Sequence, residues 1–220
     1  MNKFYLLILI TMMSIYSHAH SANLQAGDLI ISEIMSNPAA VSDTNGEWFE
    51  IFNASASTHD LNGLILSDEG SNSHAIDNTG SLFINPGEYL LLGRNPDSSF
   101  NGGLNLDYAY SNFTLSNSTD QIILLFDSVE IARLDYNGAP FGIAGSSAEI
   151  IAQKSISNET DYQAVDILQY GDGDFGTPGT AGSFELVSGA SNVPLPGALW
   201  LFASVSLIGL RALKFKSSVS

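Results

Sequence analysis

Two histidines lie beside hydroxyl and carboxyl side chains, the groups that a hydrolytic serine site combines. His59 precedes Asp60, and His74 follows Ser73. His20 would join them only if N-terminal processing left it in place. A serine–histidine–aspartate relay could be assembled from such residues, but the sequence lacks the Gly-x-Ser-x-Gly turn that exposes the serine of many hydrolases. We therefore expect His59 and His74 to be solvated loop residues, and we expect no enzymatic activity.

Glu50 is the most unusual acid of the chain. In an extended strand it shares one face with Trp48 and Phe52, while Phe49 and Ile51 take the other face. Such a carboxyl group could have a perturbed pKa and serve a hydrolase whose site is not recognised. The alternative is a structural glutamate at the rim of a sheet, accepting hydrogen bonds from backbone or from the Trp indole. We favour the structural role because the sequence places no second acid or histidine beside it.

Two acidic loops, residues 68–72 and 172–174, offer the oxygen ligands that calcium prefers. Neither loop completes the EF-hand ligand pattern. We therefore expect solvated acidic turns and no cofactor. A weak calcium site, and with it calcium-dependent adhesion or carbohydrate binding, is kept as an alternative.

The charge and the cysteine content exclude other classes of function. The 220 residues carry a formal charge of −16, and all 23 acidic residues lie between Asp28 and Glu185, where only Arg94, Arg133 and Lys154 oppose them. That segment therefore carries a formal charge of −20, which repels phosphate backbones, so we expect no nucleic-acid partner. Cysteine is absent, which rules out disulfides, thiol nucleophiles and thiolate metal sites.

Both ends of the chain are typical of export signals. Lys3 is followed by an apolar run over residues 4–13 and by small residues up to position 22, which predicts a signal peptide over residues 1–22 with cleavage within 19–22. An uncleaved anchor is disfavoured because the run is short for a membrane span. We expect export.

The C-terminal segment, residues 193–216, combines a proline motif, an apolar helix and a basic end. The motif is Val193, Pro194, Leu195 and Pro196, and the basic stop is Arg211, Lys214 and Lys216. The basic end favours a cytoplasmic position, which leaves the acidic domain outside. This order resembles the VPLP type of PEP-CTERM sorting tail, with Gly197 where Ala is usual. The resemblance implies an exosortase-like processing partner in a bacterium that makes exopolysaccharide; an ordinary tail anchor is the alternative. Residues 188–192 are expected to form a flexible linker.

The segment between the two ends predicts short strands and no long helix. Apolar runs rich in Ile, Leu and aromatic residues alternate with Gly, Asn, Asp and Pro, which is typical of a sandwich or barrel. The expected strands cover residues 29–35, 47–52, 61–66, 88–92, 121–126 and 130–136, the last two forming a hairpin around Asp127 and Ser128.

These segments, in this order, resemble the lamin-tail domain, which is an immunoglobulin-like β-sandwich. The resemblance extends over about residues 28–182, and its most specific element is residues 46–53. The residues of this motif, to which we assign structural roles, are Gly46, Glu47, Trp48, Glu50 and Asn53. The resemblance implies an interaction module and supplies no catalytic set.

Together these observations predict an all-β, immunoglobulin-like β-sandwich over residues 23–187, flanked by an N-terminal signal helix and a C-terminal transmembrane-like helix. We expect an exported bacterial binding or structural protein at the cell surface or in the extracellular matrix, anchored in the membrane at least transiently. Its expected partners are the exosortase-like enzyme, the membrane through the C-terminal helix, and a polysaccharide or protein ligand.

Overall fold

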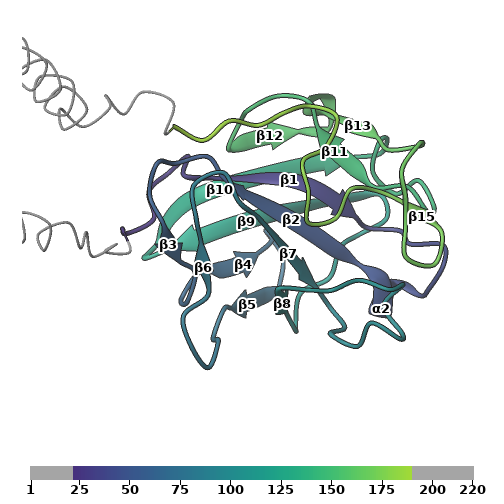
Figure 1. The fold of residues 1–220 in the computed structure, drawn as a ribbon, viewed down its shortest axis with the longest axis horizontal. Helices are drawn as coiled ribbons and strands as arrows, with labels where there is room; N and C mark the ends of the chain where they lie inside the picture. The colour runs from purple at the N-terminus through teal and green to yellow at the C-terminus, as the bar shows by residue number, and fades with distance from the viewer. Residues whose placement is uncertain (1–21, 190–220) are drawn as a thin grey trace, which may run out of the picture. The chain divides into compact units, whose positions relative to one another are not determined.

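A computed structural model describes residues 22–189, which are mostly β-strands arranged in several sheets (Figure 1). The expected signal peptide, apart from Ala22, and the whole sorting tail lie outside the described residues, as do residues 190–192 of the expected linker. Within residues 22–189 there is no helix of the length and apolar character needed to cross a membrane.

The larger sheet has six strands, in the order β13-β11-β1-β2-β7-β8. Its strands are β13 (Tyr162–Ala164), β11 (Ala148–Ile150), β1 (Leu29–Met35), β2 (Trp48–Asn53), β7 (Tyr89–Gly93) and β8 (Tyr108–Ala109). Every residue of β1 and of β2 is buried. These two central strands are therefore covered on both faces of the sheet.

The second sheet has five strands, in the order β12-β10-β9-β4-β5. These are β12 (Ile156–Asn158), β10 (Val129–Asn137), β9 (Thr119–Phe126), β4 (Ile65–Ser67) and β5 (Ser73–Ala75). Two small sheets, β3 (His59–Asp60) with β6 (Phe83–Ile84) and β14 (Gln169–Tyr170) with β15 (Asp174–Phe175), complete the fold, together with the short helices α2 (Asp43–Gly46) and η1 (Glu159–Asp161).

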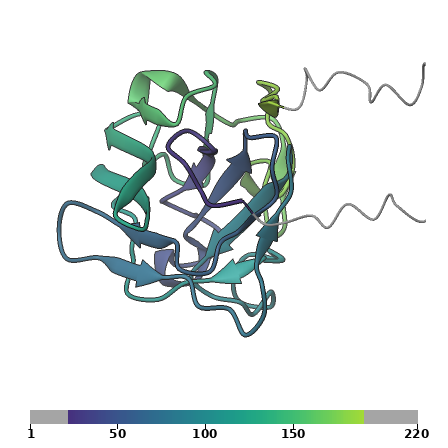
Figure 2. The ribbon, with the colours of Figure 1, turned by 90° about the vertical axis from the view of Figure 1, so that its left-hand side faces the viewer.

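The main hydrophobic core combines residues of both large sheets. Phe49, Ile51 and Leu92 come from the six-stranded sheet, and Leu124 and Leu134 come from the five-stranded sheet. Figure 2 shows the two sheets side by side, seen from the left-hand side of Figure 1. A second, smaller cluster on the other face of the six-stranded sheet contains Met35, Trp48, Leu91 and Leu104.

Most of the expected strands are confirmed. The segments expected at 29–35, 47–52 and 88–92 are β1, β2 and β7, and the expected hairpin is β9 and β10. Its two turn residues, Asp127 and Ser128, have positive φ angles of 48° and 67°, as a tight hairpin turn requires.

The strand expected over 61–66 is wrong for most of its length, because only β4 at its end is extended. Gly63 has a φ of +87°, and Leu64 N–H donates to the Leu61 carbonyl at 3.0 Å. The chain therefore turns where the apolar pattern predicts a strand. The helix α2 and the short strands β3, β5, β6, β8 and β11 to β15 were not predicted.

The loop after β10 contains a glycine that no other residue can replace without displacing backbone. Gly142 has a φ of +74°, and an added Cβ would lie 1.9 Å from the Asn117 carbonyl oxygen. Gly138, four residues earlier, has a φ of +79° and nothing within 4 Å of the same position. The two glycines share a backbone conformation and differ in the space around them.

We predict that Gly142→Ala lowers the free energy of unfolding by at least about 2 kcal/mol more than Gly138→Ala. Alanine is strained at the positive φ of either position, so this cost is common to both variants. The difference between their free energies of unfolding therefore measures the collision with Asn117. Urea unfolding followed by circular dichroism measures both values. Equal losses would show that the loop moves freely and that this contact does not constrain it.

Candidate functional site

Three glutamates lie side by side on adjacent strands of the six-stranded sheet. Glu33 of β1 pairs with Glu149 of β11 on one side and with Glu50 of β2 on the other. Their exposed fractions are 1%, 4% and 1%, respectively. We call these three residues the glutamate row.

A β-bulge puts Glu33 in this row. The pairing of β1 with β2 shifts between Ile31 and Glu33, so that Ser32 is an extra residue. Without the bulge, alternation would turn Glu33 to the same face as Ile31, which packs in the main core. The bulge therefore moves this carboxyl group to the face that carries Glu50, and the Ser32 hydroxyl lies 2.6 Å from Glu50 Oε1.

The outer side of the row is covered by residues 176–183, which we call the strap. Thr177 donates to Glu33 through its N–H at 2.9 Å and its hydroxyl at 2.6 Å, and Gly179 N–H donates to Glu50 at 2.7 Å. Ser183 donates to Glu149 through its N–H at 2.9 Å and also through its hydroxyl. Each glutamate thus has its own donors on the strap, which is coloured near the yellow end of the bar in Figure 1.

Burial changes the acidity of two of these glutamates. The pKa of Glu50 is raised to about 9. Burial is the main cause and the neighbouring Glu33 contributes, while the hydrogen bonds from Ser32 and Gly179 lower the pKa by less. Burial also raises the pKa of Glu33, more strongly than the hydrogen bonds from Ser147 and Thr177 lower it, and Glu149 adds to the increase. Glu50 is therefore protonated near neutral pH.

Glu50 accepts a backbone hydrogen bond and also has the perturbed pKa of the alternative interpretation, but its expected place at the rim of the sheet is wrong. Glu50 lies on β2, inside the six-stranded sheet, and accepts the expected backbone hydrogen bond from Gly179. The Trp48 indole N–H donates instead to the Tyr170 hydroxyl at 2.9 Å. The sequence did not indicate Glu33 and Glu149 as neighbours of Glu50. Glu33 reaches the row through the bulge and Glu149 through the pairing of the distant β11, and neither leaves a local sequence signal.

Three other residues of the motif, Gly46, Glu47 and Asn53, lie at the two ends of β2. Gly46 lies where an added Cβ would come within 2.4 Å of Val41 Cγ2. Burial raises the pKa of Glu47 to about 7, even though Glu47 accepts a hydrogen bond from Arg94 at 3.1 Å. Asn53 ends β2, where its side-chain amide donates to the carbonyls of Ser57 and Ile84 at 2.8 and 3.0 Å.

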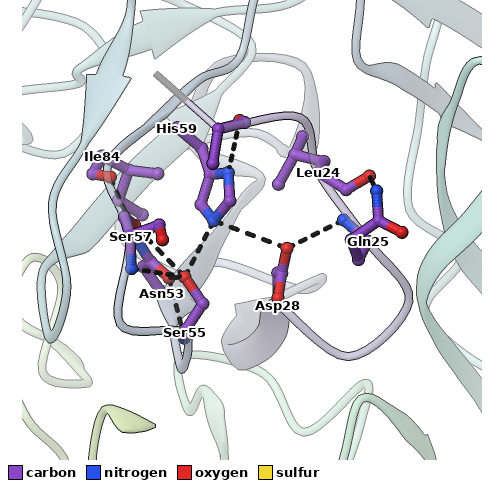
Figure 3. A network of polar contacts seen from close by, with 9 residues as sticks. Leu24, Gln25, Asp28, Asn53, Ser55, Ser57, His59 and Ile84 are labelled. Carbon is purple, nitrogen blue, oxygen red and sulfur yellow. Dashed lines mark hydrogen bonds and ion pairs between the residues drawn. The ribbon is translucent and has the colours of Figure 1, made fainter. Parts of the chain in front are cut away.

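His59 is buried in β3, so the expectation of a solvated loop histidine is wrong. Figure 3 shows its ring between Ser55 and Asp28. The Nε2 atom lies 2.8 Å from Ser55 Oγ and 3.5 Å from Asp28 Oδ2, and Nδ1 lies 2.8 Å from the Ala22 carbonyl oxygen. Since a carbonyl only accepts, Nδ1 carries a proton and donates it to Ala22.

This arrangement differs from a catalytic relay. In a relay the carboxylate contacts the ring nitrogen that faces away from the serine. Here Asp28 and Ser55 approach the same nitrogen, and the other nitrogen binds backbone. The Ser55 hydroxyl also lies 2.8 Å from Asn53 Oδ1. The three residues therefore connect the start of the domain to β3.

His74 differs from the solvated loop residue that we expected, whereas the acidic loops are exposed turns at residues 69–71 and 172–173 and buried at Asp174. His74 is half-buried in β5, its Nε2 lies 2.9 Å from the Tyr108 hydroxyl, and burial lowers its pKa. The Asp68 carboxylate accepts the N–H groups of Gly70 and Asn72 at 2.7 and 3.1 Å. Asp174 is buried and accepts the N–H groups of Ala39 and Ala40 at 3.1 Å. No group of three or more metal-ligating side chains converges within residues 22–189.

Residues 22–138 match the lamin tail domain. The chain belongs to the lamin tail domain family. Glu33, Glu50 and the motif around Trp48 lie within the matched residues of this lamin tail domain, whereas Glu149 and the strap follow them. No curated protein and no solved structure matches the chain.

We predict that Glu50→Gln removes a pH dependence of stability. In the unfolded chain this carboxyl group has its ordinary pKa of about 4.5, whereas burial raises the pKa to about 9 in the folded protein. The free energy of unfolding should therefore fall as pH rises through that window. The glutamine keeps a donor for Ser32 and an acceptor for Gly179, so the variant should be more stable than wild type at about pH 8.

Thermal unfolding across this pH range measures the effect, with Glu185→Gln as the control, because Glu185 is exposed. The difference between the Glu50 variant and wild type should grow with pH, while the control should follow wild type. Parallel curves for all three proteins would refute the raised pKa of Glu50.

We predict that Thr177→Val releases the strap. The valine keeps the size of threonine but removes the hydroxyl donor to the buried Glu33, at a cost of about 1–3 kcal/mol. Amide exchange should accelerate at Gly179 and Ser183, the next contacts along the strap. Thr180→Val is the matched control, because the exposed Thr180 hydroxyl donates only within the strap, to the Thr177 carbonyl at 3.0 Å. Unchanged exchange in Thr177→Val would contradict the role of Glu33 as an anchor.

Proposed function

We propose that the chain is an exported bacterial binding or structural protein, an immunoglobulin-like sandwich that a PEP-CTERM-like tail delivers to the cell surface or the exopolysaccharide matrix. Three features support the proposal: the signal-like N-terminus, the VPLP motif with its apolar and basic continuation, and membership of the lamin tail domain family. The tail would contact an exosortase-like enzyme and, at least transiently, the membrane.

The observation that carries the binding or structural role is that the buried acids are engaged within the fold. Each member of the glutamate row accepts hydrogen bonds from the strap. The Ser55, His59 and Asp28 group likewise connects segments of the domain. These side chains hold the fold together, which supports a role through the outer surface of the domain.

The contacts of Ala22 support an upstream signal-peptide cleavage. Its N–H donates to the Thr58 carbonyl at 3.1 Å, and its carbonyl accepts from His59. Cleavage after Ala19 or Ser21 keeps both contacts, whereas cleavage after Ala22 would leave a buried imidazole without its acceptor.

We predict that the protein isolated from its own host lacks the signal peptide and the C-terminal helix. Intact mass spectrometry of the surface, matrix and inner-membrane fractions measures this directly. The double variant Pro194→Ala, Pro196→Ala should keep its tail and accumulate in the inner membrane, while the linker variant Ser191→Ala should behave as wild type. A wild-type protein that keeps its helix in the inner membrane would show an ordinary tail anchor and refute the sorting role.

A further inference from the structure

A pocket of about 190 Å³ lies between β13, the segment that follows it, and the strap. Glu149 and Gln163 lie on its inner side, Asp166, Ile167 and Leu168 line it from the segment after β13, and Ala181 lines it from the strap. Ile167 and Leu168 are 84% and 56% exposed. Large apolar side chains with this exposure, gathered at a concave site, are typical of a binding surface.

The same pocket borders an open sheet edge. β13 is the last strand of the six-stranded sheet, and no other strand within residues 22–189 pairs with its outer side. Ile151 N–H donates to the Asp161 carbonyl at 2.8 Å, and Val165 N–H donates to the Ser147 carbonyl at 2.9 Å. These bonds show that the Gln163 backbone pairs with β11. The Tyr162 N–H donates to the Glu159 carbonyl at the end of η1, so the groups that face the open side are the Tyr162 carbonyl and the N–H and carbonyl of Ala164.

The chemistry of the pocket selects a cationic occupant. Among the described residues that line it, two are acidic, none is basic and none is aromatic. The surrounding segment has a formal charge of −20, which attracts cations over the whole surface. The lining lacks the aromatic ring on which a sugar could stack, so a polysaccharide would gain little here.

We propose that the open edge of β13 and this pocket together bind an extended segment of a partner protein that carries lysine or arginine at alternate positions. The segment adds a strand to the sheet and bonds to the Tyr162 carbonyl and to the N–H and carbonyl of Ala164. Its alternate side chains lie on the strap side of the sheet, beside Gln163. A long cationic side chain there packs its stem on Ile167 and Leu168 and brings its charge to the exposed Asp166. This inference rests on the binding role proposed above and names the class of partner.

The test measures binding of short fluorescein-labelled peptides to the full-length chain in mild detergent by fluorescence anisotropy. The first peptide alternates lysine with valine, the second alternates glutamate with valine, and the third is the lysine peptide with N-methylated backbone. Only the first should bind. Hydrogen exchange should then slow at the amide of Ala164.

Three variants separate binding at this site from general attraction to an acidic protein. Asp166→Lys should weaken binding of the lysine peptide roughly fivefold. Asp77→Lys makes the same charge change at an exposed residue just after β5, on the other large sheet, and should change the affinity less than about twofold. Ala164→Pro removes an N–H that faces the open edge, which an edge strand tolerates, and should abolish binding while the circular dichroism spectrum stays unchanged.

Equal weakening by Asp166→Lys and Asp77→Lys would overturn the proposal, as would similar binding of the lysine and N-methylated peptides. Protection of residues 162–168 by a neutral dextran instead of the peptide would identify a glycan site and also overturn it. Because binding is measured on the purified chain, these outcomes do not depend on export or tail processing.

Discussion

The structure depends on burying three carboxyl groups on adjacent strands. A buried carboxyl group without hydrogen-bond partners would destabilise the sheet strongly, so the glutamate row requires donors from a covering segment. The strap supplies these donors: Thr177 donates to Glu33, Gly179 to Glu50 and Ser183 to Glu149. Its course across the sheet is therefore set by polar bonds as well as by apolar packing. The strap covers the outer face of β1 and β2, and its far end forms one wall of the pocket beside β13.

The same burial affects the charge of the domain. A raised pKa keeps Glu50 protonated near neutral pH, so the sheet does not hold three charged carboxylates in a row. The basic residues of the described segment are engaged elsewhere: Arg94 with Glu47 at 3.1 Å, Arg133 with Glu69 at 2.6 Å and Lys154 with Asp161 at 2.6 Å. The outer surface is left with an excess of unpaired acids, which favours cationic partners and disfavours phosphate-rich ones.

The sequence predicted the parts of the fold that depend on local patterns. β1, β2, β7 and the β9–β10 hairpin are apolar runs bounded by turn residues, and their extents follow from those boundaries. The short strands β11 to β15 have no such runs, since two or three residues carry no period. The segment before β4 looked extended because Leu61 and Leu64 are both buried, but they are buried from a turn. His59 was placed in solvent because its neighbours are polar, and its burial depends on partners as distant as Ala22 and Asp28.

The glutamate row could have been suspected, though not located. Trp48 and Phe52 share a face of β2 with Glu50, and Phe49 and Ile51 fill the other face. A strand that is apolar on both faces belongs to a sheet that is covered on both sides. An acid within such a strand is buried by the segment that packs on that face of the sheet. This segment must offer N–H or hydroxyl donors and carry small side chains. Residues 176–183, rich in Gly, Thr and Ser, have this composition. What the sequence could not supply is the pairing, because the bulge at Ser32 and the register of Glu149 on β11 arise only when the strands come together.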